Sequence, residues 1–207
     1  MLIHVHPENP QPRAIRTIID TLREGGIIIY PTDTIYGIGC DIFQPKAIER
    51  ICRIKQVVPE KAQLSFICYD LSDLSQYTKS ISTPLYRLLK SHLPGPYTFI
   101  LPASKEVPKI LKSRKDTIGL RVPDNMIART IVRELGHPIL SASLPGEMVE
   151  EYTDPEMMQA NFGKLVNLVV DGGIGGWTPS TIVDCTKEPP ELIRQGAGEW
   201  DTEIGSK

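Results

Sequence analysis

The residues best suited to chemistry form one short polar segment at positions 32–36, Thr-Asp-Thr-Ile-Tyr. Three hydroxyls and one carboxylate occur there, directly after the apolar run Ile27–Tyr30 and Pro31. Gly37 and Gly39 follow, where the backbone could approach a ligand closely. The pattern predicts the floor of a small-molecule site. A proline-initiated turn whose polar groups satisfy only their own backbone fits the same residues, so both interpretations stay open at this point.

Arg121 is a second candidate, because it stands between two apolar residues of a predicted strand. Leu120 and Val122 should face the core, so the arginine is expected to point from the opposite face into a cavity. Exposure at the surface is the alternative. A planar guanidinium suits a carboxylate ligand, with which it forms two parallel hydrogen bonds.

The net charge of −2 hides an uneven distribution of charge. Between Arg50 and Arg121 the chain has 13 Lys and Arg against 5 Asp and Glu, and elsewhere it has 10 against 20. Two basic groups stand out: Arg50, Arg53, Lys55 and Lys61, and then Lys105, Lys109, Lys112, Arg114, Lys115 and Arg121. Such groups suit the phosphates of a nucleotide or of RNA. A solvated face balanced by acidic neighbours is an equally good interpretation.

Length and composition are those of a globular protein, and we expect one domain over residues 1–207. With 41% hydrophobic and 23% charged residues, the chain is neither disordered nor fibrous. No apolar run approaches the roughly 20 residues that span a bilayer, and the amino end lacks a signal-peptide layout, so we expect a cytoplasmic protein without a membrane partner.

Cysteines and histidines give no sign of a disulfide framework or a metal site. The four cysteines are scattered without a Cys-x-x-Cys pair and are expected to be small buried groups: Cys40, Cys52, Cys68 and Cys185. His4 and His6 alternate on a predicted strand, which favours a solvated face over metal ligands.

Helical and strand patterns alternate along the chain and predict an α/β or α+β domain with a mixed sheet. Helices are expected over 13–24, from 45, from Thr83 and Pro84, and over 127–135 with a stop at Gly136. Strands are expected over 27–30, 64–69, 97–101, 117–122, 138–143, 165–170, 180–183 and 192–193. The phosphate-binding P-loop, the dinucleotide glycine motif and the hydrolase elbow are absent. The glycine-rich segment 172–176 favours a flexible connection over a phosphate cradle.

Five segments, in order and with matching spacing, resemble the YrdC/YciO-like family of threonylcarbamoyl-AMP synthases. They are Tyr-Pro-Thr-Asp-Thr-Ile-Tyr-Gly-Ile-Gly at 30–39, Arg-Ile-Lys at 53–55, Pro-Gly-Pro-Tyr-Thr at 94–98, Thr-Ile-Gly-Leu-Arg-Val-Pro at 117–123, and Ser-Thr-Ile-Val-Asp at 180–184 with Ile-Arg-Gln-Gly at 193–196. The resemblance spans roughly residues 10–198 and is greatest to the YciO branch, which shares the segment at 51–56.

The resemblance implies a YrdC-like fold, an open twisted mixed sheet flanked by helices around a basic concave cavity. It implies synthesis of threonylcarbamoyl-AMP and pyrophosphate from L-threonine, bicarbonate and ATP with Mg2+, in the pathway of tRNA t6A modification. The protein would be a monomer or a homodimer.

Position by position, the resemblance also implies a set of site residues. Lys55 and Arg121 would be catalytic. L-threonine would be bound by Thr32, Arg121, Ser141 and Ser180. ATP would be bound by Lys55, Thr117, Ser143 and Arg194. Fixed cations of this kind stabilise the charge that develops on a triphosphate during adenylation.

Two positions depart from the family pattern on the phosphate side. The usual Arg of Lys-x-Arg-Pro is Val57, and the usual Asn of Ser-x-Asn-x-Ser-Gly falls on Pro145. Lys61 or Arg53 could supply the missing cation. An alternative function is therefore a double-stranded RNA-, tRNA- or rRNA-binding protein without full synthase activity. A third is an α/β protein that binds another nucleotide or metabolite.

Overall fold

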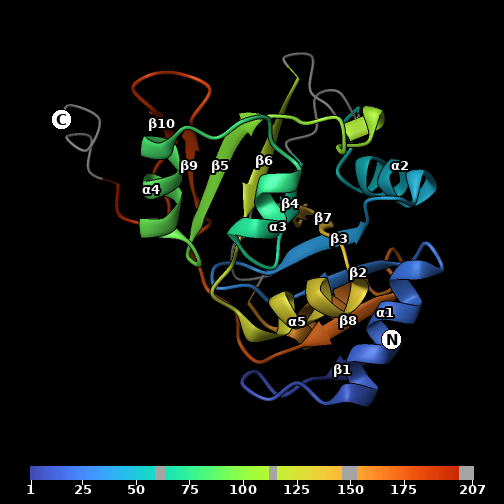
Figure 1. Ribbon diagram of the computed structural model, residues 1–207. Coiled ribbons are helices and arrows are strands. Elements are labelled where there is room, and N and C mark those ends of the chain that lie inside the picture. Colours follow the sequence, from blue (N-terminus) through green and yellow to red (C-terminus); the bar gives the residue numbers. More distant parts are fainter. Residues whose placement is uncertain (59–63, 112–115, 146–152, 201–207) are drawn as a thin grey trace.

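One mixed sheet organises the computed structural model, which describes residues 1–58, 64–111, 116–145 and 153–200 (Figure 1). The strands are β1 (Leu2–His4), β2 (Ile27–Tyr30), β3 (Gly37–Asp41), β4 (Ser65–Ile67), β5 (Tyr97–Pro102), β6 (Thr117–Arg121), β7 (Ile139–Ser143), β8 (Leu168–Asp171), β9 (Thr181–Asp184) and β10 (Glu191–Arg194). Their order is β1-β8-β2-β3-β7-β4-β6-β5-β9-β10, with parallel and antiparallel pairs. The predicted mixed α/β architecture is confirmed.

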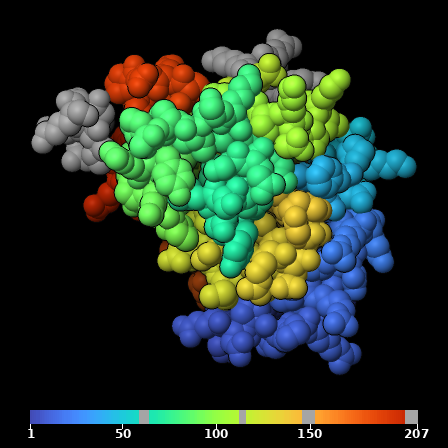
Figure 2. Space-filling model, viewed as in Figure 1, coloured from blue at the N-terminus to red at the C-terminus, as the bar shows by residue number. Residues whose placement is uncertain are grey.

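Helices flank this sheet. They are α1 (Pro12–Arg23), α2 (Pro45–Ile54), α3 (Leu71–Gln76), α4 (Thr83–His92), α5 (Met126–Leu135) and α6 (Pro155–Phe162), with a short 3-10 turn η2 (Lys109–Leu111). Figure 2 shows the side chains of α3, α4 and α5 covering one side of the molecule. Where the structure describes the chain, no helix is long and apolar enough to cross a membrane.

The two faces of the sheet carry separate cores, because successive side chains of a strand point in opposite directions. In β2, Ile27 and Ile29 belong to the larger core, which includes side chains of α2, α3, α4 and α6. Ile28 and Tyr30 belong to the smaller core beneath α1 and α5. This second face also carries Ile67, whose partner in β6 is Arg121. The face packed by α1 and α5 therefore continues to Arg121.

Most predicted elements occur within a few residues of their expected ends. The helix expected from Thr83 and Pro84 begins there, and its cap is Ser82, whose Oγ accepts a hydrogen bond from the Leu85 N–H. The structure also contains β3, α3 and α6, which were not expected. His4 lies in β1 and contacts Asp171, whereas His6 lies beyond the strand. The four cysteines are buried and none is part of a disulfide, as predicted.

The glycine-rich loop at 172–176 is hydrogen-bonded to the polar segment, which corrects its interpretation as a flexible connection. The Tyr36 hydroxyl donates to Gly173 O at 2.6 Å and accepts from the Gly172 N–H at 3.1 Å. The Gly176 N–H donates to Thr34 O at 2.9 Å. These bonds fix the loop against residues 34–36. Of the basic residues singled out in the sequence, Lys61, Lys112, Arg114 and Lys115 lie outside the described residues.

Candidate functional site

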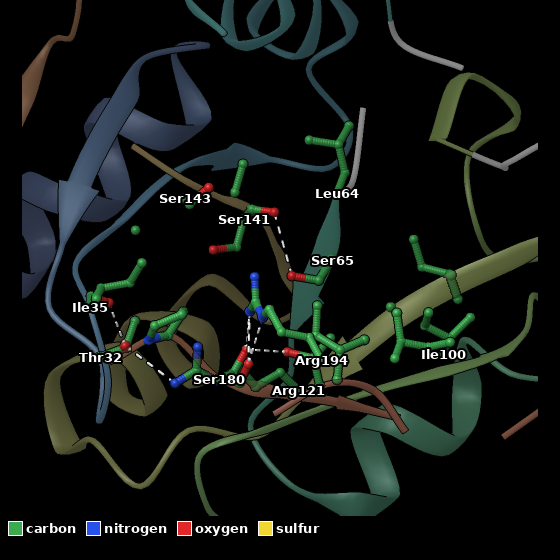
Figure 3. A pocket seen from close by; sticks show the side chains of 18 of the residues that line it. Thr32, Ile35, Leu64, Ser65, Ile100, Arg121, Ser141, Ser143, Ser180 and Arg194 are labelled. Atoms are coloured by element: carbon green, nitrogen blue, oxygen red, sulfur yellow. Dashed lines mark hydrogen bonds between the residues drawn. The ribbon is translucent and has the colours of Figure 1, made fainter. Parts of the chain in front are cut away.

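A cavity of about 640 Å³ lies on the same sheet face as the α1 and α5 core, beyond the area that those helices cover. Its floor is a row of aligned positions in β7, β4, β6 and β5, namely Ser141, Ser65, Gly119 and Ile100. Figure 3 shows Ser141 and Ser65 adjacent on this floor. All eight site residues expected from the sequence line the cavity: Thr32, Lys55, Thr117, Arg121, Ser141, Ser143, Ser180 and Arg194.

Burial divides these eight residues into two groups. The four expected to bind L-threonine are at most 9% exposed: Thr32, Arg121, Ser141 and Ser180. The four expected to bind ATP are half-buried or exposed: Lys55, Thr117, Ser143 and Arg194. The cavity thus has a deep end with one guanidinium and several hydroxyls, and a mouth with two further cations.

Arg121 lies at the deep end and is held by the polar segment. Its Nη2 forms an ion pair with Asp33 and donates to Thr34 Oγ1 at 2.8 Å and to Thr32 Oγ1 at 3.3 Å. Its Nε is buried and has no hydrogen-bond partner among the described residues. Because an unpaired buried donor is costly, this N–H is a ready contact for a ligand oxygen. The expected cavity position of Arg121 is confirmed.

The polar segment at 32–36 is both a hydrogen-bonded turn and part of the cavity lining, which are the two interpretations that the sequence left open. Thr32 Oγ1 donates to Ile35 O at 2.8 Å and accepts from the Thr34 N–H at 3.0 Å, which are bonds within the turn. The same hydroxyl lines the cavity and accepts from Arg121. Asp33, which was not among the expected site residues, is the ion-pair partner of that arginine.

Ser180 and Arg194 form a second polar group beside Arg121 (Figure 3). Ser180 Oγ is 2.9 Å from Thr98 Oγ1, and its carbonyl accepts from Arg194 Nη2 at 2.7 Å and Nε at 3.2 Å. Burial, and then the charge of Arg121, lower the pKa of Arg194. Two guanidinium groups therefore act on the same cavity.

Lys55 and Ser143 meet at the mouth. Lys55 Nζ donates to Ser143 O at 2.6 Å and to Ser143 Oγ at 3.2 Å. Burial lowers the pKa of Lys55. Val57 also lines the cavity, so the family arginine that it replaces would have lain at this mouth, whereas Pro145 is not part of the lining.

Gly37 and Gly39 of β3 make room for neighbouring protein atoms as well as for the cavity. This corrects part of the expectation that both glycines let the backbone approach a ligand. A Cβ on Gly39 would lie 2.5 Å from Leu140 O and 3.0 Å from the Tyr30 ring. A Cβ on Gly37 would lie 3.1 Å from Ser141 Oγ and 3.3 Å from the same ring. Gly37 borders the cavity, but Gly39 does not. The absent side chains make room for Tyr30.

The described residues of the cavity lining include hydroxyls and cations, and none of them carries a carboxylate. Within the described part of the chain, no group of three His, Cys, Asp or Glu side chains could hold a metal ion. Mg2+ in nucleotide sites is commonly held through substrate phosphates and water with few protein ligands. The described lining residues are compatible with Mg2+ held in this way.

Comparison with known proteins identifies the same family as the five sequence segments. A model of the Sua5_yciO_yrdC family, described as telomere recombination, matches residues 20–196. The uncharacterized protein YciO of Escherichia coli K12 is 43% identical over 199 residues, covering 95% of each chain. The threonylcarbamoyl-AMP synthase of Vibrio vulnificus YJ016 is 31% identical over 185 residues, covering 88% of this chain and 98% of the synthase.

Solved structures of YciO and Sua5 proteins also match the chain. The crystal structure of E. coli YciO matches with a TM-score of 0.90 and 41% identity, over 99% of this chain and 98% of that one. The crystal structure of P. abyssi Sua5 complexed with L-threonine matches with a TM-score of 0.84 and 28% identity, over 95% of this chain and 57% of that one.

Proposed function

Because the chain belongs to the Sua5/YciO/YrdC family, we propose that it is an ATP-dependent nucleotidyltransferase of the L-threonylcarbamoyladenylate synthase type. The reaction joins L-threonine, bicarbonate and ATP into threonylcarbamoyl-AMP and releases pyrophosphate and water. Other proteins would then transfer the threonylcarbamoyl group to tRNA in t6A modification.

The observation that carries the proposal is the division of one cavity into a buried end and an open mouth. A small amino acid suits the deep end, where Arg121 can meet its carboxylate and Ser180 can meet its polar groups. A nucleotide is larger and suits the mouth, where Lys55 and Arg194 can meet its phosphates. The two substrates would then touch inside the cavity.

The charge of the site supports anionic ligands. Arg121, Arg194 and Lys55 bring three cations to the cavity, whereas Asp33 is the carboxylate paired with one of them. The excess positive charge would attract a carboxylate and a triphosphate. It would also stabilise the step in which a carbamate oxygen bonds to the α-phosphorus of ATP and the bond to pyrophosphate breaks.

Mg2+ would enter on the phosphates of ATP and neutralise part of their charge. Lys55 would then move its hydrogen bonds from Ser143 to a phosphate oxygen. Thr117 and Ser143 line the same cavity and would meet the nucleotide there.

A product assay tests the proposal. The protein is incubated with ATP, Mg2+, bicarbonate and radiolabelled L-threonine, and the adenylate and pyrophosphate are separated and counted. We expect product with the native protein and with Arg87→Ala, which removes an exposed arginine of α4. Arg121→Ala should give a blank. Product from the native protein that does not exceed the Arg121→Ala level would contradict the proposal.

The RNA-binding alternative rests on the basic middle of the chain. Among the described residues of its second basic group, Lys105 and Lys109 are exposed, and Arg121 is engaged in the cavity. These two lysines do not by themselves define an RNA surface. RNA binding therefore stays a prediction from the sequence, and its affinity should fall steeply with rising salt.

A further inference from the structure

Tyr30 reaches the cavity from the core without lining it. Its side chain has no exposed surface and belongs to the core beneath α1 and α5. Its hydroxyl nevertheless lies 2.6 Å from Ser141 Oγ, on the cavity floor. The two residues come from β2 and β7, which are separated by β3. The tyrosine ring thus crosses a whole strand to reach the serine.

The glycines of β3 make this crossing possible. Gly37 and Gly39 lie beneath the ring, and a Cβ at either position would come within 3.3 Å of it. At Gly37 the added carbon would also lie 3.1 Å from Ser141 Oγ. Side chains in β3 would therefore separate Tyr30 from Ser141.

The burial of Tyr30 sets the direction of its hydrogen bond to Ser141. Burial raises the pKa of Tyr30, so its hydroxyl keeps its proton at neutral pH. Ser141 Oγ is the hydrogen-bond partner of this hydroxyl, and a buried O–H that donates to nothing is costly. Tyr30 therefore donates and Ser141 accepts. A serine hydroxyl has one hydrogen, and within the described residues that of Ser141 has no acceptor. That hydrogen remains available to the cavity.

We propose that Tyr30 is a positioning residue that makes Ser141 a fixed hydrogen-bond donor toward an oxygen of the bound amino acid. This inference rests on the proposed function, since it assigns L-threonine to the deep end of the cavity. A donor polarised by a second hydrogen bond is stronger, and a hydroxyl held in one of its three rotamers loses no rotational freedom when the ligand arrives.

A double-mutant cycle tests the inference through titration calorimetry with L-threonine. Tyr30→Phe keeps the ring and removes the hydroxyl, and we expect the dissociation constant to rise about three- to tenfold. Ser141→Ala should weaken binding at least as much. Because Tyr30 acts through Ser141, adding Tyr30→Phe to Ser141→Ala should cause no further loss. Gly37→Ala, which crowds Ser141, should likewise weaken binding alone but not in the Ser141→Ala background.

The matched control is Tyr86→Phe, which removes the hydroxyl of an exposed tyrosine and should leave the constant unchanged. Native affinity retained in Tyr30→Phe, or losses that add up in the double variant, would overturn the inference while the proposed function stands. A native protein that does not bind L-threonine would instead contradict the proposed function, and with it the role given to Ser141. Gly37→Ala keeps the cycle decisive if Tyr30→Phe fails to fold.

Discussion

Arg121 and Asp33 form an ion pair in which the two side chains are only 8% and 10% exposed. The residues are 88 positions apart in the sequence. The second oxygen of Asp33 accepts from the Asp124 N–H at 3.0 Å, just before α5 begins. One carboxylate therefore joins the polar segment, the guanidinium of β6 and the start of a helix. The deep end of the cavity is built around this pair.

Asp33→Asn should lower the free energy of unfolding by about 3 kcal/mol, because it leaves the buried charge of Arg121 without its partner. Asp20→Asn, at an exposed position of α1, should change stability by less than about 0.5 kcal/mol. Urea unfolding at neutral pH measures both. Equal stability of the two variants would show that the pair does not hold this end of the cavity.

Val57→Arg should tighten ATP binding about tenfold, since it returns a cation to the cavity mouth beside Lys55. The matched control is Val58→Arg, which adds the same charge to an exposed neighbour outside the cavity lining. Calorimetric titration with ATP and Mg2+ compares the two variants with the native protein. Identical gains in both variants would mean that charge alone, rather than its place in the mouth, controls the affinity.

The affinity for ATP should fall as pH rises through a window below 10.5, the ordinary pKa of lysine. Burial lowers the pKa of Lys55, so its ammonium loses the proton earlier than an exposed lysine would. Only the protonated form attracts phosphate, which fixes the sign of the change. Lys55→Arg keeps its charge throughout and should flatten the profile. A native profile with the same slope as that of Lys55→Arg would exclude this lysine as the titrating group.

Gly39→Ala should destabilise the protein by about 2 kcal/mol or more, because its Cβ would meet the Leu140 carbonyl at 2.5 Å and the Tyr30 ring. A Cβ on Gly136 would meet no atom within 4 Å. Gly136→Ala strains only the left-handed backbone of a helix cap, so it should lower the free energy of unfolding by about 1 kcal/mol. Thermal unfolding ranks the two variants. The reverse order would contradict the packing of Tyr30 over β3.

Local patterns were enough to predict most of the elements. The apolar spacing of α1 and α5, and the helix stop at Gly136, are properties of neighbouring residues, and they were predicted correctly. β3 was missed because its sequence, Gly-Ile-Gly-Cys-Asp, is poor in typical strand residues and follows a polar turn. Its strand pairing comes from β2 and β7, far away in the sequence.

Six of the eight site residues lie in the five matching segments, Ser141 and Ser143 came from the same family resemblance outside those segments, and all eight line one cavity. The sequence did not predict which other residues contact these side chains and hold them in position. Tyr30 was interpreted as the end of an apolar strand, and its contact with Ser141 spans 111 positions. Asp33 was counted with the polar floor, but its pairing with Arg121 depends on the approach of two distant strands. Such long-range pairs leave no local pattern.

The most direct test of the account is a crystal structure of the protein soaked with L-threonine, ATP and Mg2+. The account predicts difference density for the amino acid at the deep end, with its carboxylate against Arg121, and for the nucleotide at the mouth beside Lys55 and Arg194. Density for the nucleotide at the deep end, or an empty cavity at saturating concentrations, would contradict it.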